Sequence, residues 1–84
     1  MSVTGKLYAI SDNPHIRTGL ALAGISGQDA HTPEEVSRAL EGLAQDIGIV
    51  IVTSGLAAKS ADILEKYREE KTLPLITIIP EPVA

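Results

Sequence analysis

Two unbroken apolar runs constrain the fold of this chain more than any other feature. They span 47–53 (IGIVIVT) and 75–79 (LITII), and neither run alternates apolar with polar residues. A strand with one face in water alternates, whereas a strand that is apolar on both faces is typical of a parallel sheet covered by helices on both sides. The two runs therefore predict an α/β fold, in which any small-molecule site lies outside the carboxyl ends of the strands.

The rest of the chain completes a β-α-β-α-β-α-β order, which predicts one α/β domain over residues 1–84. Right-handed crossovers between parallel strands then give a four-stranded sheet in the order 2-1-3-4, with a receiver-like or flavodoxin-like topology. Besides the two apolar runs, strands are predicted at Lys6–Ser11 and, at an edge, within Ile25–Ala30. Helices are predicted from Pro14 to about Ala23, from Pro33 onward, and from about Ala61 to Lys71.

Helix start signals support these positions. Asn13 can cap a helix that has Pro14 at its first position, and Thr32 to Glu35 (TPEE) has the pattern of a capping box. Ser54 and Ser60 are competing helix starts, and between them we expect only a short turn at Leu56–Ala58.

Gly19, in the middle of the first predicted helix, has two explanations that the sequence leaves open. A helical glycine costs about 1 kcal/mol relative to alanine. Either a neighbouring element approaches Gly19 closely, or the position is exposed and the glycine is tolerated.

Composition excludes several functional classes. The chain has no cysteine, so disulfides, thiolate metal sites and a cysteine nucleophile are excluded. The net charge of −4, with seven basic residues spread among eleven acidic ones, argues against a nucleic-acid partner. No apolar stretch approaches the roughly 20 residues that span a bilayer, and the N-terminus has no signal-peptide pattern. We therefore predict a soluble cytoplasmic protein that does not insert into a membrane.

Polar residues follow the first and third predicted strands, at Ser11-Asp12-Asn13 and Thr53-Ser54-Gly55. Serine, threonine, aspartate and asparagine commonly cap helices at such turns, and this interpretation is favoured over a phosphate or cation site. The single carboxylate, Asp12, does not form a site for a hard cation. The hydroxyls of Thr53 and Ser54 have no histidine or lysine positioned in sequence to activate them as nucleophiles. We predict no catalytic residue, no metal and no cofactor.

A bacterial receiver domain has the same predicted architecture. Receivers need an acidic cluster after the first strand, a phosphorylatable aspartate ending the third strand and a lysine ending the last. In this chain the first strand is followed by a single acidic residue, Asp12, the third strand ends in Thr53, and the last strand ends in Ile79-Pro80. A phosphorelay role is therefore not expected.

Several segments together resemble the F subunit of the A-type and V-type rotary ATPases. Residues 8–12 (YAISD) and 19–25 (GLALAGI) resemble the opening of that family. The capping box and the two apolar runs follow in the same order and spacing, so the similarity covers nearly the whole chain. Leu20 replaces the usual aromatic residue, and Ser54-Gly55 replaces the acidic residues after the third strand. The family also usually continues into a C-terminal helix along the rotor shaft, whereas this sequence ends at Ala84.

The resemblance implies a non-catalytic component of the central stalk. Such a component would bind the coiled-coil shaft subunit, rotate with it, and help to couple ATP hydrolysis or synthesis to proton or sodium transport. It would be a peripheral component of a membrane complex. The alternative is a small receiver-like regulatory domain that binds a ligand in the crevice between the first and third strands.

The last predicted strand is the candidate partner-contact surface. It is apolar, it is predicted to lie at a sheet edge, and Pro74 and Pro80 bound it. An apolar edge strand invites coverage by another chain. The candidate contact residues are Leu75, Thr77, Ile79, Pro80 and Pro82.

Overall fold

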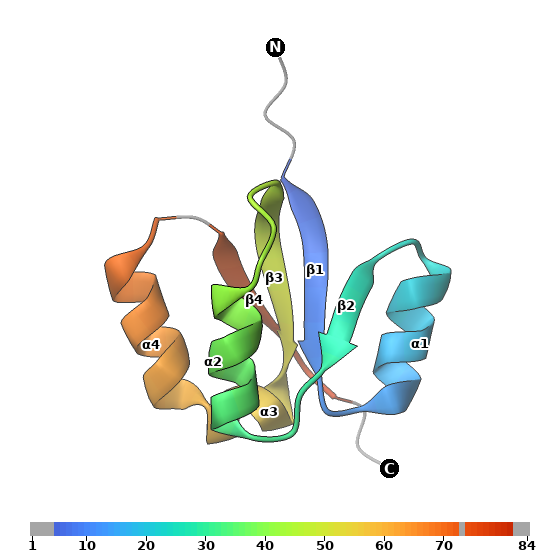
Figure 1. The fold of residues 1–84 in the computed structure, drawn as a ribbon. Coiled ribbons are helices and arrows are strands. Elements are labelled where there is room, and N and C mark those ends of the chain that lie inside the picture. The colour runs from blue at the N-terminus through green and yellow to red at the C-terminus, as the bar shows by residue number, and fades with distance from the viewer. Residues whose placement is uncertain (1–4, 73, 82–84) are drawn as a thin grey trace.

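A computed structural model describes residues 5–72 and 74–81 of the chain. These residues form four strands and four helices, and the strands make one sheet against which the helices pack (Figure 1). The elements are β1 (Lys6–Ser11), α1 (Pro14–Leu22), β2 (Ser26–Asp29), α2 (Pro33–Glu41), β3 (Ile47–Thr53), α3 (Ser54–Lys59), α4 (Ala61–Glu70) and β4 (Leu75–Ile79).

All four strands are parallel, and their order β2-β1-β3-β4 confirms the predicted topology. The register aligns rows of residues across the sheet: Ile10 pairs with Val52, which pairs with Ile78. In the neighbouring row Ala9 pairs with Ile51, which pairs with Thr77. Because successive side chains of a strand point to opposite faces, these two rows lie on opposite faces of the sheet.

The hydrophobic core lies between one face of the sheet and the helices α2, α3 and α4 (Figure 1). In α2 the buried residues Val36, Ala39 and Leu40 recur at the spacing of one helix face. The largest core side chains are aliphatic: Ile10, Val50 and Val52 from the strands, and Val36, Leu40, Leu56 and Leu64 from the helices.

The opposite face of the sheet is only partly covered. Among the described helices α1 packs against β1 and β2 on this face, and it has no fully buried residue of its own. Ala9, beneath α1, is buried, whereas Leu75 on β4 keeps 57% of its surface exposed. The apolar surface over β3 and β4 on this face therefore stays partly open to solvent.

The α1 helix ends in a glycine cap. Gly24 has a φ of 87°, a left-handed conformation that glycine adopts without strain. The backbone N–H of Ile25 donates to the carbonyl of Leu20, and that of Gly24 to the carbonyl of Ala21. This pair of bonds is a Schellman motif.

The prediction for residues 56–58 was wrong. In place of a short turn the structure has α3, and α4 begins directly after Ser60. Both Ser54 and Ser60 therefore precede or open a helix, instead of competing for one. The reason is burial, because Leu56 is fully buried in the core and fixes the first turn of α3 against β3.

Candidate functional site

The carboxyl ends of β1 and β3 bring the two predicted polar loops together. The Thr53 hydroxyl donates to Asp12 Oδ1 over 3.4 Å. Lys59 Nζ lies 3.4 Å from Asp12 Oδ2 and also donates to the carbonyl of His31. The Asp12 carboxylate is thus paired with a lysine from α3, and Lys59 connects α3 to both Asp12 and His31.

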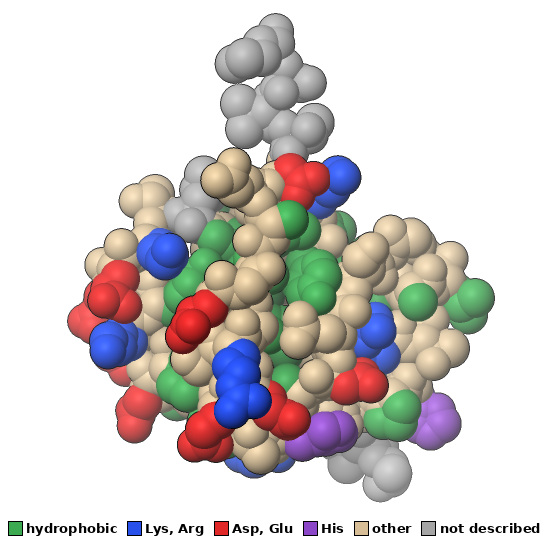
Figure 2. All heavy atoms as spheres, viewed as in Figure 1, with side chains coloured by type: hydrophobic (Ala, Val, Ile, Leu, Met, Phe, Trp, Pro, Cys, Tyr) green, Lys and Arg blue, Asp and Glu red, His purple; other side chains and the backbone are tan. Residues whose placement is uncertain are grey.

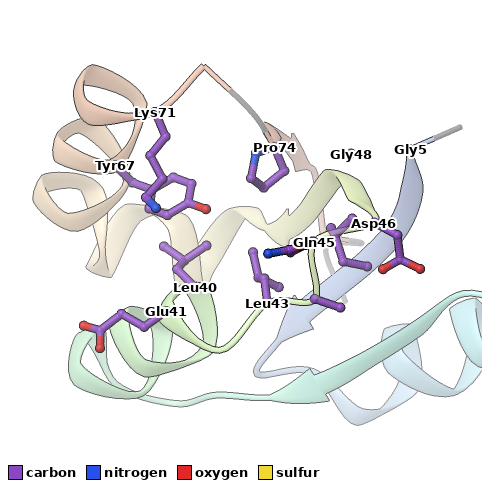
Figure 3. Close-up of a pocket in the computed structure, with 12 residues that line it drawn as sticks. Gly5, Leu40, Glu41, Leu43, Gln45, Asp46, Gly48, Tyr67, Lys71 and Pro74 are labelled. Atoms are coloured by element: carbon purple, nitrogen blue, oxygen red, sulfur yellow. The ribbon is translucent and has the colours of Figure 1, made fainter. Parts of the chain in front are cut away.

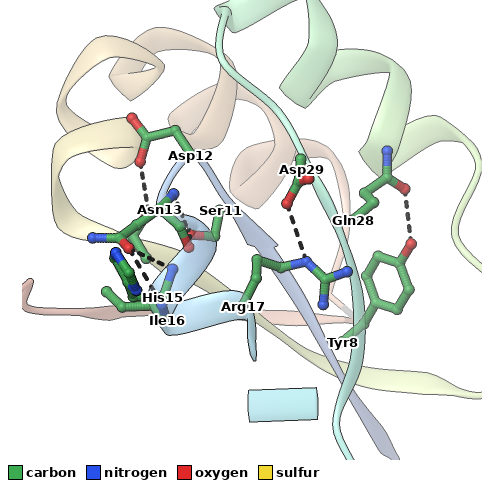
Figure 4. A network of polar contacts seen from close by, with 10 residues as sticks. Tyr8, Ser11, Asp12, Asn13, His15, Ile16, Arg17, Gln28 and Asp29 are labelled. Atoms are coloured by element: carbon green, nitrogen blue, oxygen red, sulfur yellow. Dashed lines mark hydrogen bonds and ion pairs between the residues drawn. The ribbon is translucent and has the colours of Figure 1, made fainter. Parts of the chain in front are cut away.

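Asn13 and Ser11 serve the start of α1 (Figure 4). Asn13 Oδ1 accepts from the backbone N–H groups of His15 and Ile16, at 3.0 and 3.3 Å. Ser11 Oγ accepts from the backbone N–H of Asn13 at 2.9 Å. These bonds satisfy N–H groups that a helix start otherwise leaves unpaired, which supports the capping interpretation of these residues.

Glu81, which follows β4, reaches into the same crevice. Its Oε1 accepts from the backbone N–H of Gly55 at 2.6 Å, and its Oε2 lies 3.5 Å from Asn13 Nδ2. The backbone N–H of Glu81 donates to Ser54 Oγ at 3.2 Å. Sequence analysis missed this residue because its partners lie 26 to 68 positions away along the chain, and no local pattern signals such a contact.

The crevice offers little chemistry. In residues 5–72 and 74–81 there is no group of three or more His, Cys, Asp or Glu side chains that could hold a metal ion. Thr53, the counterpart of a receiver's phosphoacceptor, is buried and bonded to Asp12. What the arrangement does is join the strand ends, cap α1 and hold the segment after β4.

A hollow of about 350 Å³ lies at the opposite end of the sheet, between the ends of α2 and α4 (Figure 3). Leu40, Leu43 and Tyr67 form its apolar part. Burial raises the pKa of the Tyr67 hydroxyl, and Lys71 Nζ lies 5.7 Å from the centre of the Tyr67 ring. Because sites in open α/β sheets lie at the carboxyl ends of the strands, this hollow at the amino ends is not our candidate site.

The predicted partner-contact residues lie on one edge of the sheet. Leu75, Thr77 and Ile79 alternate along β4 and so share one face, on which Leu75 and Thr77 are exposed and Ile79 is half-buried. Pro80 is exposed, and Pro82 lies outside the described residues. Ile49 and Ile51 of β3 extend this surface, because they pair with Leu75 and Thr77. We call these five strand residues, 49, 51, 75, 77 and 79, the β3/β4 surface.

Charged side chains are mixed on the face that Figure 2 shows, where acidic and basic groups alternate over α2 and α4. Charged residues of both signs follow one another along α4: Asp62, Glu65, Lys66, Arg68, Glu69 and Glu70. This face therefore has no basic patch suited to a phosphate backbone. Among the described helices, none has both the length and the apolar character that crossing a membrane requires.

The fold places the chain among receiver-like α/β proteins. It superimposes on the crystal structure of a response regulator receiver protein from Pseudomonas putida with a TM-score of 0.65, covering 100% of this chain and 74% of that one. The two sequences are 18% identical, so this similarity concerns the fold alone.

Sequence comparison gives the family. The family model described as ATP synthase (F/14-kDa) subunit matches residues 7–83. The F subunit of the A-type ATP synthase of Methanosphaera stadtmanae is 36% identical over 75 residues, which cover 87% of this chain and 71% of that protein. The chain belongs to the family of the ATP synthase (F/14-kDa) subunit, which confirms the resemblance found in its sequence.

Proposed function

We propose that this protein is a non-catalytic component of the central stalk of an A-type or V-type ATPase. It binds the coiled-coil shaft subunit, rotates with it, and helps to couple ATP hydrolysis or synthesis to proton or sodium transport. It is a cytoplasmic, peripheral component of that membrane complex and carries no cofactor. Membership of the family of the ATP synthase (F/14-kDa) subunit supports this proposal.

The observation that carries the proposal is the partly open β3/β4 surface. Leu75 keeps 57% of its surface exposed, and Ile49, Ile51 and Ile79 are half-buried. Covering apolar area stabilises a complex by about 25 cal/mol per Å². A helix of a coiled coil presents an apolar stripe of suitable width, so one shaft helix laid over β3 and β4 would cover these side chains.

The crevice supports the non-catalytic part of the proposal. Thr53, Asp12 and Lys59 bond to one another or to backbone groups, and the Gly55 N–H is bonded to Glu81. These residues are used to connect the strand ends, so no specific observation favours the alternative of a receiver-like ligand site here.

Calorimetric titration against the purified coiled-coil shaft protein of the same organism tests the proposal. We expect the unchanged chain to bind and the variant Leu75→Asp to bind at least about tenfold more weakly, because the contact would bury a carboxylate in place of an apolar group. The matched control is Leu22→Asp, the same substitution at a residue of α1 that is 85% exposed.

Two outcomes would contradict the proposal. If the unchanged chain does not bind the shaft protein, the stalk assignment fails. If Leu22→Asp weakens binding and Leu75→Asp does not, the shaft contacts α1 and the β3/β4 surface is the wrong site. Circular dichroism of both variants checks that each is folded.

A further inference from the structure

We infer that Glu81 acts as a reversible latch, which closes the crevice between β1 and β3 and holds Pro80 and Glu81 against the carboxyl end of β3. The latch consists of Glu81 and its three partners Asn13, Ser54 and Gly55. This inference does not rest on the proposed function, because it concerns contacts within the chain.

The contacts of Glu81 replace a cap that α3 lacks. Thr53, the residue before α3, makes no side-chain bond to the helix. The Gly55 N–H, in the first turn of α3, instead donates to the Glu81 carboxylate at 2.6 Å. A backbone N–H bonded to an ionised carboxylate is among the stronger hydrogen bonds in proteins. A distant residue therefore supplies what a local serine or threonine usually supplies.

Residue 55 is matched to this arrangement. A Cβ built on Gly55 would lie 2.6 Å from Glu81 Oε1, closer than Cβ atoms approach other heavy atoms. Glycine at this position thus leaves the space that the carboxylate fills. On the other side, Asn13 uses Oδ1 to cap α1 and presents Nδ2 to Glu81 Oε2. One amide side chain thereby links the start of α1 to the segment after β4.

The position of the latch explains its consequence for the chain. The described chain passes from the end of β4, an edge strand, across the carboxyl end of β3 toward the start of α1 (Figure 1). With the latch closed, Glu81 is bonded to Asn13, Ser54 and Gly55 at the carboxyl ends of β1 and β3. With the latch open, these three partners face solvent, and Pro80 and Glu81 are released from the carboxyl end of β3.

The latch can open reversibly because its bond between Gly55 and Glu81 is exposed to solvent. Water can therefore replace this bond when the latch opens. A hydrogen bond that exchanges with water contributes only modestly, and its loss changes an equilibrium by roughly tenfold. The latch therefore opens at a modest cost in free energy, so that the open state is a populated minor state, as a conformational switch requires.

Amide hydrogen exchange of the intact chain, measured by NMR, tests the latch at residue 55. In Glu81→Ala we expect the Gly55 amide to exchange roughly tenfold faster than in the unchanged chain. The control Glu69→Ala removes an exposed carboxylate from α4 and should leave the exchange at Gly55 unchanged.

A second pair of variants separates the latch from a general loss of stability. Asn13→Asp keeps the oxygen that caps α1 but sets a carboxylate against Glu81, so we expect faster exchange at Gly55 with the His15 and Ile16 amides unaffected. In the double variant Asn13→Asp with Glu81→Gln, the glutamine amide can donate to the new carboxylate, and slow exchange should return.

Two results would overturn the inference. One is a Gly55 amide that already exchanges at the rate of an open peptide in the unchanged chain. The other is an exchange rate at Gly55 that neither Glu81→Ala nor Asn13→Asp alters.

Discussion

Replacing two glycines by alanine is expected to change stability in opposite directions. Gly19 lies inside α1, and a Cβ built there meets nothing within 4 Å. This decides between the two explanations that the sequence left open, because no described element approaches Gly19. Alanine is the better helix former by about 1 kcal/mol, so Gly19→Ala should raise the free energy of unfolding by about 0.5–1 kcal/mol.

Gly48 lies near the start of β3 and faces Gly5 across the sheet. A Cβ built on Gly48 would overlap the Cα of Gly5, a backbone atom that cannot rotate away. Overpacking of this kind costs about 1–3 kcal/mol, and the reduced entropy of the unfolded chain offsets about 0.5–1 kcal/mol of that cost. Gly48→Ala should therefore lower the free energy of unfolding by about 1–2 kcal/mol.

The assay is urea unfolding followed by far-ultraviolet circular dichroism, since the chain has no tryptophan. We expect the two variants to differ by about 1.5–3 kcal/mol with the same dependence on urea. In a domain of this size that difference corresponds to roughly 6–24 °C in Tm. A Gly48→Ala variant as stable as the unchanged chain would refute the close approach of the strands. A destabilised Gly19→Ala variant would show that another group packs against α1 there.

Substitutions at three further residues test local features by the same unfolding assay and, for Asp46, also by NMR titration. Thr32→Ala should cost about 1 kcal/mol, because Thr32 Oγ1 accepts from the Glu35 N–H at 3.1 Å, and Thr32→Ser should restore the stability. Ser60→Ala should leave stability unchanged or raise it by up to about 1 kcal/mol, because the buried Ser60 Oγ has no hydrogen-bond partner among the described residues; a clear loss would show that the hydroxyl is bonded. The hydrogen bond and charge of Lys6, 2.9 Å away, lower the pKa of Asp46 from its ordinary value of 3.8. The NMR titration of the Asp46 carboxyl should therefore have its midpoint below pH 3.8. A carboxyl whose pKa is lowered by folding stabilises the protein at a pH above the pKa of the unfolded chain, and this stabilisation is lost as the pH falls through the pKa of the folded state. Asp46→Asn should therefore weaken the loss of stability below about pH 4.

Local sequence patterns correctly predicted the helices and strands that are determined by residues close together in the chain. The apolar run Ile47–Thr53 became the central strand β3, and the expected capping bond from Glu35 N–H to Thr32 is present. The reciprocal bond differs slightly, because Glu35 Oε1 accepts from the N–H of His31, one residue before the cap. The strand order followed because crossover handedness leaves few topologies for this order of elements.

What the sequence did not predict depends on distant partners. The helix α3 forms because Leu56 is buried against β3 and a carboxylate from Glu81 bonds to its first turn. Of the candidate site, the proximity of Asp12 and Thr53 was predicted from the topology, whereas the lysine that pairs with Asp12 was not. The apolar pattern of β4 indicates that its side chains can be buried. Because β4 lies at the edge of the sheet, Leu75 is nevertheless 57% exposed.

Cross-linking in the assembled ATPase tests the proposed rotor role most directly. The chain has no cysteine, so Thr77→Cys provides a single site on the exposed β3/β4 surface for a photoreactive label. We expect the label to cross-link to the coiled-coil shaft subunit and the cross-linked complex to retain its ATP hydrolysis, because two parts that rotate together can be joined without stopping rotation. A cross-link to the catalytic head instead of the shaft, or a shaft cross-link that abolishes hydrolysis, would contradict the rotor assignment.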